Sequence, residues 1–166
     1  MRAHSLAVLA IFLLVSPALA VDVIELKNGR IYQVRSAKVT GSRLFMSLVP
    51  TAAGEKIGFA VPISKVVPEF VYYVWADQVE GDVDGHVMLA EWSRKNGLFS
   101  LARKQYQLAG KINPAVHSNL PKLEEKMYEE QATWIYEDAE KLFRDGDIKR
   151  CRMRITVIQV LPSSRE

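Results

Sequence analysis

The chain has little of several residue types on which small proteins depend for chemistry. Cys151 is the only cysteine among 166 residues, so no disulfide can form within the chain. Its three histidines form no HExxH pattern and have no cysteine partner for a zinc site. A GxSxG elbow and a glycine loop for phosphate are missing too. These absences argue against an enzyme, and we expect neither a metal nor a cofactor.

The chain also has only a small excess of one sign of charge. The formal net charge is +3 at pH 7, too small to indicate nucleic acid as a partner. The charge is instead divided into blocks: seven acidic residues lie between Glu124 and Lys141, and basic residues follow from Arg144 to Arg154. Such blocks are typical of solvated helix faces. We expect Cys151, which lies within the basic block, to be a buried structural thiol.

The longest apolar run lies near the N-terminus, from Leu6 to Val15, and is too short to span a bilayer comfortably. Arg2 precedes it, and Ala18-Leu19-Ala20 follows in the small-x-small pattern that signal peptidase recognises. We therefore expect residues 1–20 to be a signal peptide and the protein to be exported, periplasmic or secreted, with no membrane span after cleavage. A membrane anchor or a buried first helix is the alternative interpretation.

Residues 21–67 alternate between apolar and polar with the period of β-strands. Asn28-Gly29 separates two such runs and is a strong hairpin signal, and Gly41-Ser42 marks a second turn. We predict a small antiparallel β module, either a sheet or a Src-homology-3-like barrel. Residues 68–82 form a linker or docking segment, and their aromatic, β-branched run fits a strand as well as a short helix.

Residues 83–162 have the period of helices, and their pattern occurs twice. A helix, a glycine, a second helix and a proline follow one another, with Gly97 and Gly146 at the turns and Pro114 and Pro162 at the ends. Pro121 can begin another helix, because the first helical position needs no N–H. Residues 163–166 are a tail. The predicted fold class is α+β: a small antiparallel β-barrel or sheet followed by antiparallel helical hairpins.

The residues around Gly97 resemble the tetratricopeptide repeat family. Counted from that glycine, the family's small positions fall on Ala90, Ala102 and Ala109, its large position on Tyr106 and its closing proline on Pro114. The second unit differs, because Ile158 replaces a small residue and Gly146 follows Gly97 by 49 residues instead of 34. An extended first helix would absorb that difference. The β module is similar to modules placed ahead of such repeats in exported bacterial proteins.

The resemblance implies a concave face that binds another protein or a peptide in the cell envelope. Carried over by position, the groove comprises Asp84, Val87, Glu91, Arg94 and Lys95 in the first unit and Thr133, Tyr136, Glu140, Phe143 and Arg144 in the second. Its mixture of charged and apolar side chains suits peptide capture. The same residues also fit a solvated surface that binds nothing.

The aromatic residues allow an alternative function. An exposed cluster of Tyr32, Phe45 and Phe59 would indicate a β module that binds cell-wall glycan or peptide and is braced by the helices. Inward-facing rings would instead make them core. We expect Trp92, Tyr106 and Trp134 to belong to the helical core, because they lie at core spacing.

A calcium loop is a further alternative. Glu80, Asp82, Asp84, Gly85 and Glu91 have the spacing of such a loop. The first ligand is glutamate instead of aspartate, however, and the helical repeat already accounts for Glu91. Asp84 is better suited to be a helix N-cap.

Two repeat-like units are fewer than a solenoid usually needs, because each end leaves an apolar side uncovered. We therefore predict that the β module docks on the first helical hairpin of the same chain. Part of the segment from Phe70 to Trp75 would be buried between them.

Overall fold

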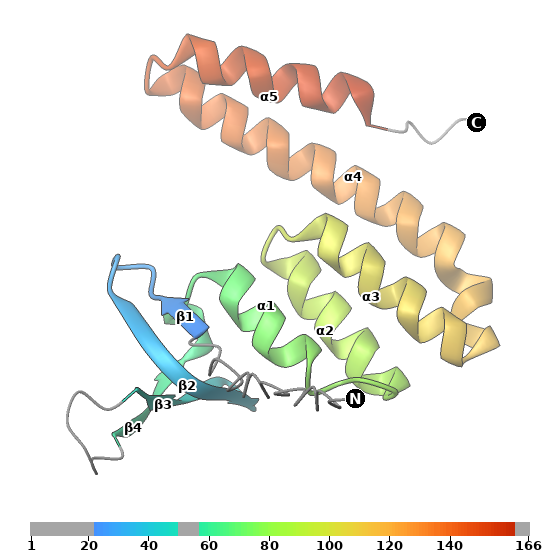
Figure 1. The fold of residues 1–166 in the computed structure, drawn as a ribbon. Coiled ribbons are helices and arrows are strands. Elements are labelled where there is room, and N and C mark those ends of the chain that lie inside the picture. The colour runs from blue at the N-terminus through green and yellow to red at the C-terminus, as the bar shows by residue number, and fades with distance from the viewer. Residues whose placement is uncertain (1–21, 50–56, 162–166) are drawn as a thin grey trace, which may run out of the picture.

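The computed structural model describes residues 22–49 and 57–161, which form an α+β fold (Figure 1). The strands are β1 (Asp22–Glu25), β2 (Ile31–Thr40), β3 (Arg43–Leu48) and β4 (Gly58–Pro62), followed by a single 3-10 turn, Ile63–Lys65. The α-helices are α1 (Pro68–Ala76), α2 (Val83–Lys95), α3 (Phe99–Ile112), α4 (Pro114–Arg144) and α5 (Ile148–Val160). The predicted fold class is therefore confirmed at the level of α+β.

The strands form one open antiparallel sheet in the order β1-β2-β3-β4. The predicted turns are present, with Gly29 and Gly41 at φ values of 80° and 57° that suit glycine. In the described residues β1 and β4 do not pair, so the sheet is not closed into a barrel. A bridge between Leu26 and Val66 ties the end of β1 to the segment after β4.

One face of the sheet packs against α1. Ile24, Val34 and Leu44 point to that face and are almost fully buried, and Val71 of α1 joins the same cluster. The ambiguous segment is thus helical at residues 68–76, with Pro68 in the first turn, where its missing N–H costs nothing. These residues form a helix instead of a strand because a helix covers the apolar face of the sheet, which a fifth strand would leave open.

The same helix joins the sheet to the helical hairpins, as predicted. Phe70 and Val74 pack on the sheet core, and Trp75 contacts Trp92 of α2 with ring centroids 5.9 Å apart. Val79, after α1, is buried with Leu89 of α2. Figure 1 shows the resulting order in space, from the sheet through α1, α2 and α3 to the hairpin of α4 and α5.

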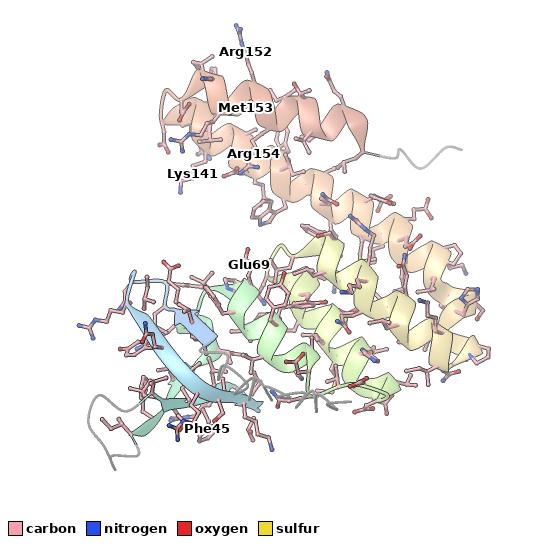
Figure 2. All side chains as sticks on the ribbon, viewed as in Figure 1. Phe45, Glu69, Lys141, Arg152, Met153 and Arg154 are labelled. Carbon is pink, nitrogen blue, oxygen red and sulfur yellow. The ribbon has the colours of Figure 1, made fainter. Side chains whose placement is uncertain are left out.

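The two helical hairpins turn where the glycines predicted them. Gly97 and Gly146 have φ values of 77° and 79°, in the left-handed region that glycine enters most readily. Ala90, Ala102 and Ala109 are fully buried, so α2 and α3 approach closely. In the second hairpin α5 packs on the outer half of α4, where Cys151 is buried as expected and Arg154 (Figure 2) donates to Asp138 Oδ2 at 2.7 Å.

The predicted helix start at Pro121 is wrong. α4 begins at Pro114, capped by Asn113, whose Oδ1 accepts from the N–H of Ala115 at 2.9 Å. Pro114 therefore follows closely after the end of α3 and is also the first residue of α4, with only Asn113 between the two helices. Pro121 lies inside α4, where a proline removes one hydrogen bond and costs about 3 kcal/mol. Burial of Leu120 and Met127 against the neighbouring helices offsets that cost.

None of the helices in residues 22–49 and 57–161 combines the length and the apolar character that a bilayer crossing needs. The predicted signal peptide lies outside the described residues, as do the loop from Pro50 to Lys56 and Pro162.

We predict that Gly97→Ala destabilises the protein by about 1–2 kcal/mol through the left-handed backbone alone. A Cβ at this position would also lie 3.3 Å from the ring of Trp134, a tight contact. Gly146→Ala is the matched control, because its φ is similar but no atom lies within 4 Å of the added Cβ. Chemical unfolding should show the larger loss at Gly97, and a gain in stability at either glycine would contradict the hairpin geometry.

Candidate interaction groove between α2 and α4

The structure brings part of the predicted groove together in one open depression of about 410 Å³. Arg94 and Lys95 at the end of α2 face Thr133 in the middle of α4. The other side chains that line it are Phe99, Glu129, Glu130, Trp134 and Glu137. The depression therefore joins helices from both predicted units, with cations on one wall and carboxylates on the other.

Arg94 connects the two walls of the depression. Its Nη2 donates to Glu91 Oε2 on the same helix at 2.6 Å, and its Nη1 donates to Glu130 of α4 at 2.5 Å. Tyr106 of α3 donates its hydroxyl hydrogen to the other oxygen of Glu91. The guanidinium thus joins α2 to α4 directly, since its planar fork can bind two carboxylates at once, and α3 is joined to the network through Glu91.

The charges in this network stabilise one another. Hydrogen bonds to Glu91 and Glu130 raise the pKa of Arg94, so the guanidinium stays charged. Partial burial would raise the pKa of the Glu91 carboxyl, but hydrogen bonds from Tyr106 and Arg94 outweigh burial and lower it. Burial and the bond to Glu91 raise the pKa of Tyr106, which therefore stays a donor. The hydrogen bonds that join Arg94, Glu91, Glu130 and Tyr106 are consequently kept at neutral pH.

This network makes a prediction about pH. Because the folded-state pKa of Glu91 is below its ordinary value of 4.5, its contribution to stability is present above that value and is lost as pH falls through the folded-state pKa. Glu91→Gln should therefore lose less stability than the wild type between about pH 5 and pH 3. Urea unfolding at several pH values measures the difference.

Tyr106→Phe is the matched variant, because it removes one donor and leaves the carboxyl. The pKa of Glu91 should then rise toward its ordinary value, so Tyr106→Phe should lose less stability than the wild type between about pH 5 and pH 3, although more than Glu91→Gln. Identical pH profiles for the three proteins would contradict the coupling.

The position of Trp134 differs from the sequence-based expectation. This residue was predicted to be core, but 47% of it is exposed. Its ring lies over Gly97 and meets Phe99 edge to face, with centroids 6.5 Å apart. The neighbouring Ile135 and Ala139 are buried instead. Tyr106 is buried and Trp92 half-buried, as predicted.

The remaining predicted residues lie outside the depression. Asp84 is exposed at the opposite end of α2, and Val87 packs partly into the core between α2, α3 and α4. Four residues continue along the outer half of α4 with exposed side chains: Tyr136, Glu140, Phe143 and Arg144. Within this group, Arg144 and Glu140 pair at 3.8 Å.

Sequence reasoning missed Glu130 and Glu137, which line the groove from α4. They stand three residues before and four after Thr133, the spacing that places helix residues on one face. That spacing could have identified them once Thr133 was chosen.

The expected N-cap at Asp84 is wrong, because α2 begins at Val83 with Asp82 in the N-cap position. Asp84 is consequently in the first turn of the helix, and Glu91 is committed to Arg94. No group of three or more side chains of metal-ligand type clusters within the ranges that the structure covers.

Comparisons with protein families, with curated proteins and with solved structures find no match to this chain.

Proposed function

We propose that this protein is an exported, non-enzymatic interaction module that binds another protein or a peptide in the cell envelope. A signal peptide of residues 1–20 would direct its export. In this proposal the helices form a tetratricopeptide-like array, and the sheet is a Src-homology-3-like module whose barrel is not closed. Supporting features are the buried alanines between α2 and α3, the buried Tyr106 and the left-handed glycine in each hairpin.

One observation carries the proposal: α2 and α4 present opposite charges and the exposed Trp134 around a single open groove. Half-exposed aromatic residues flanked by charge are typical anchors for a partner. The Arg94 network holds this groove in shape before any partner arrives, which reduces the ordering cost of binding.

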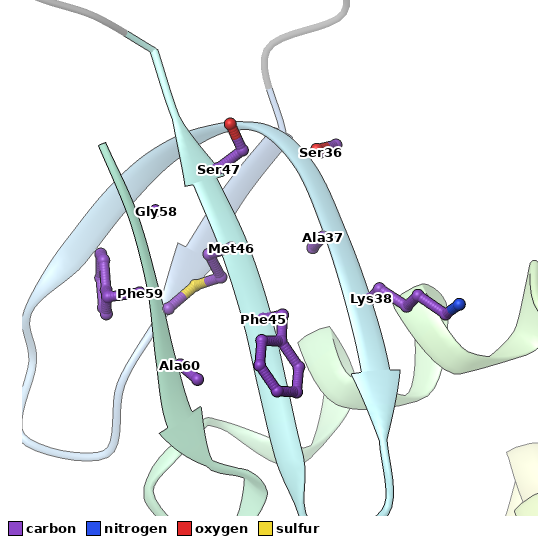
Figure 3. A pocket seen from close by; sticks show the side chains of 9 residues that line it. All are labelled: Ser36, Ala37, Lys38, Phe45, Met46, Ser47, Gly58, Phe59 and Ala60. Atoms are coloured by element: carbon purple, nitrogen blue, oxygen red, sulfur yellow. The ribbon is translucent and has the colours of Figure 1, made fainter. Parts of the chain in front are cut away.

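The glycan-binding alternative keeps only part of its support. Tyr32 and Phe59 pack on the sheet core, with their ring centroids 5.0 Å apart, so these three rings do not form the exposed cluster that this alternative requires. Phe45 alone is 46% exposed. Figure 3 shows it on β3 between Lys38 and Ala60, at an open pocket that is also lined by Phe59 and by small residues of β2 and β4. One exposed ring beside the half-buried Phe59 favours this function less than the groove favours peptide binding.

Affinity capture from envelope extract tests the proposal when wild type and two variants are compared. The groove variant carries Lys95→Glu and Thr133→Arg, and the sheet variant carries Phe45→Ala. We expect one partner, identified by mass spectrometry, to be retained by wild type and by the sheet variant and to be lost with the groove variant. The reverse pattern would overturn the proposal in favour of the β module.

Export makes a separate prediction. Protein recovered from outside the cytoplasm should begin at Val21, because the small-x-small site ends at Ala20. N-terminal sequencing measures this, and exported material that still begins at Met1 would contradict a cleaved signal.

A further inference from the structure

A second cleft lies away from the predicted groove, between α1 and α3 over the first turns of α2. Its volume is about 480 Å³, within the range of small-molecule sites. Its floor is polar and made by Tyr72, His86 and Gln105. Residues of α1, of the turn before α2 and of α3 make the walls.

The floor is a chain of three buried polar side chains. Only 2% of Tyr72, 6% of His86 and 2% of Gln105 is exposed. The Nδ1 of His86 lies 2.6 Å from Gln105 Oε1, and Gln105 Nε2 donates to the Tyr72 hydroxyl oxygen at 2.7 Å. Because an amide oxygen can only accept, the hydrogen of His86 is on Nδ1.

This arrangement leaves two hydrogen-bonding groups for a ligand. The hydroxyl hydrogen of Tyr72 is not used by Gln105, and Nε2 of His86 has no partner among the described residues. Among residues 22–49 and 57–161, Ser93 Oγ is the one fully enclosed side-chain polar atom that has no hydrogen bond. Nε2 of His86 is therefore not fully enclosed, and His86 is one of the residues that line the cleft. A neutral imidazole nitrogen of this kind accepts hydrogen bonds.

The rim carries opposite charges on opposite walls. Lys104 and Lys111 stand two turns apart on one face of α3, and Asp77 and Glu80 lie on the wall formed by the end of α1 and the following turn. Across the described ranges, none of these four side chains makes a salt bridge. The walls are thus charged but not neutralised by each other.

Apolar surface lies between the charged rims. Leu108 and Ile112 follow the lysine stripe on α3, and Tyr73 and Ala76 face them from α1. Ile112 and Tyr73 are both substantially exposed. A ligand that fits must therefore combine an apolar body with one charge of each sign.

We propose that this cleft binds a short peptide with both ends free and apolar side chains, of about dipeptide size. The carboxylate would lie toward Lys104 and Lys111, and the ammonium toward Asp77 and Glu80. The apolar side chains would pack on Leu108 and Ile112, while the peptide N–H donates to His86 Nε2. This site is independent of the groove between α2 and α4.

Titration of the full chain with leucyl-leucine, followed by calorimetry or NMR, tests the proposal. We expect saturable binding that weakens at least about tenfold when the probe is N-acetylated or C-amidated, since each change removes one charge-assisted contact. A blocked probe that binds as well as the free dipeptide would overturn the proposal, as would no saturable binding.

Variants locate the site. Lys104→Glu with Lys111→Glu should abolish leucyl-leucine binding without unfolding the protein, because both side chains are exposed. The matched control is Lys122→Glu with Lys126→Glu on exposed positions of α4, which should bind as wild type. Equal binding by both double variants would contradict the assignment. The groove variant with Lys95→Glu and Thr133→Arg should keep leucyl-leucine binding, so failure of either proposal is seen separately.

Discussion

A fragment that begins at Asp82 should be unfolded as a monomer, or should associate through bared apolar surface. The cut removes α1 and Val79, which cover Leu89 of α2, and it removes Trp75 from its contact with Trp92. It also removes Tyr72, so Gln105 loses a buried hydrogen-bond partner, which costs about 1–3 kcal/mol by itself. Circular dichroism with thermal melting and sedimentation measures the outcome.

A fragment beginning at Pro68 is the control. It keeps α1 and the cluster around Leu89, and loses only the sheet. It should retain more helix and a more cooperative transition than the shorter fragment. If the fragment from Asp82 instead melts sharply as a monomer, the two parts of the chain are independent and the docking of α1 is not needed.

Met127→Ala should destabilise the protein by about 2–5 kcal/mol, the usual cost of emptying a buried methionine site. Only 1% of Met127 is exposed, and it packs with Ala90, Ala102 and Tyr106 where α4 meets the first hairpin. The substitution therefore weakens the attachment of the second hairpin to the first. Denaturant unfolding measures the loss.

The same substitution at Met153 is the matched control. Met153 is 52% exposed on α5 (Figure 2), so Met153→Ala should change stability by no more than about 0.5 kcal/mol. Equal effects at the two methionines would contradict the packing of α4 on α2 and α3.

Local chemistry was sufficient to predict the turns and the two periods of the chain. Gly29, Gly41, Gly97 and Gly146 all adopt positive φ, a conformation that other residues avoid, so their positions specify where the chain reverses. The change from a period of two to a helical period also survives in the structure. Alternation alone could not decide whether the sheet closes, because closure depends on pairing between β1 and β4.

Other features depend on contacts between distant parts of the chain. The segment from Pro68 to Ala76 has β-branched and aromatic residues, yet it is helical because it covers the sheet. Pro121 lies inside a helix because tertiary packing outweighs its local preference.

The polar networks were missed for the same reason. Glu130 is 36 residues from Arg94, and Tyr72 is 33 residues from Gln105. No local pattern indicates such pairs. Their existence follows from the order in which α1, α2, α3 and α4 pack.

Site-specific photo-crosslinking in cells that export the protein tests the central claim most directly. A photoreactive phenylalanine at Thr133 lies at the groove, one at Lys122 lies on an exposed position of the same helix, and one at Phe45 lies on the sheet. The account predicts a discrete protein adduct from position 133 that disappears with Trp134→Ala, and none from positions 122 or 45. An adduct from position 45 alone, or equal labelling from 133 and 122, would contradict a binding groove between α2 and α4.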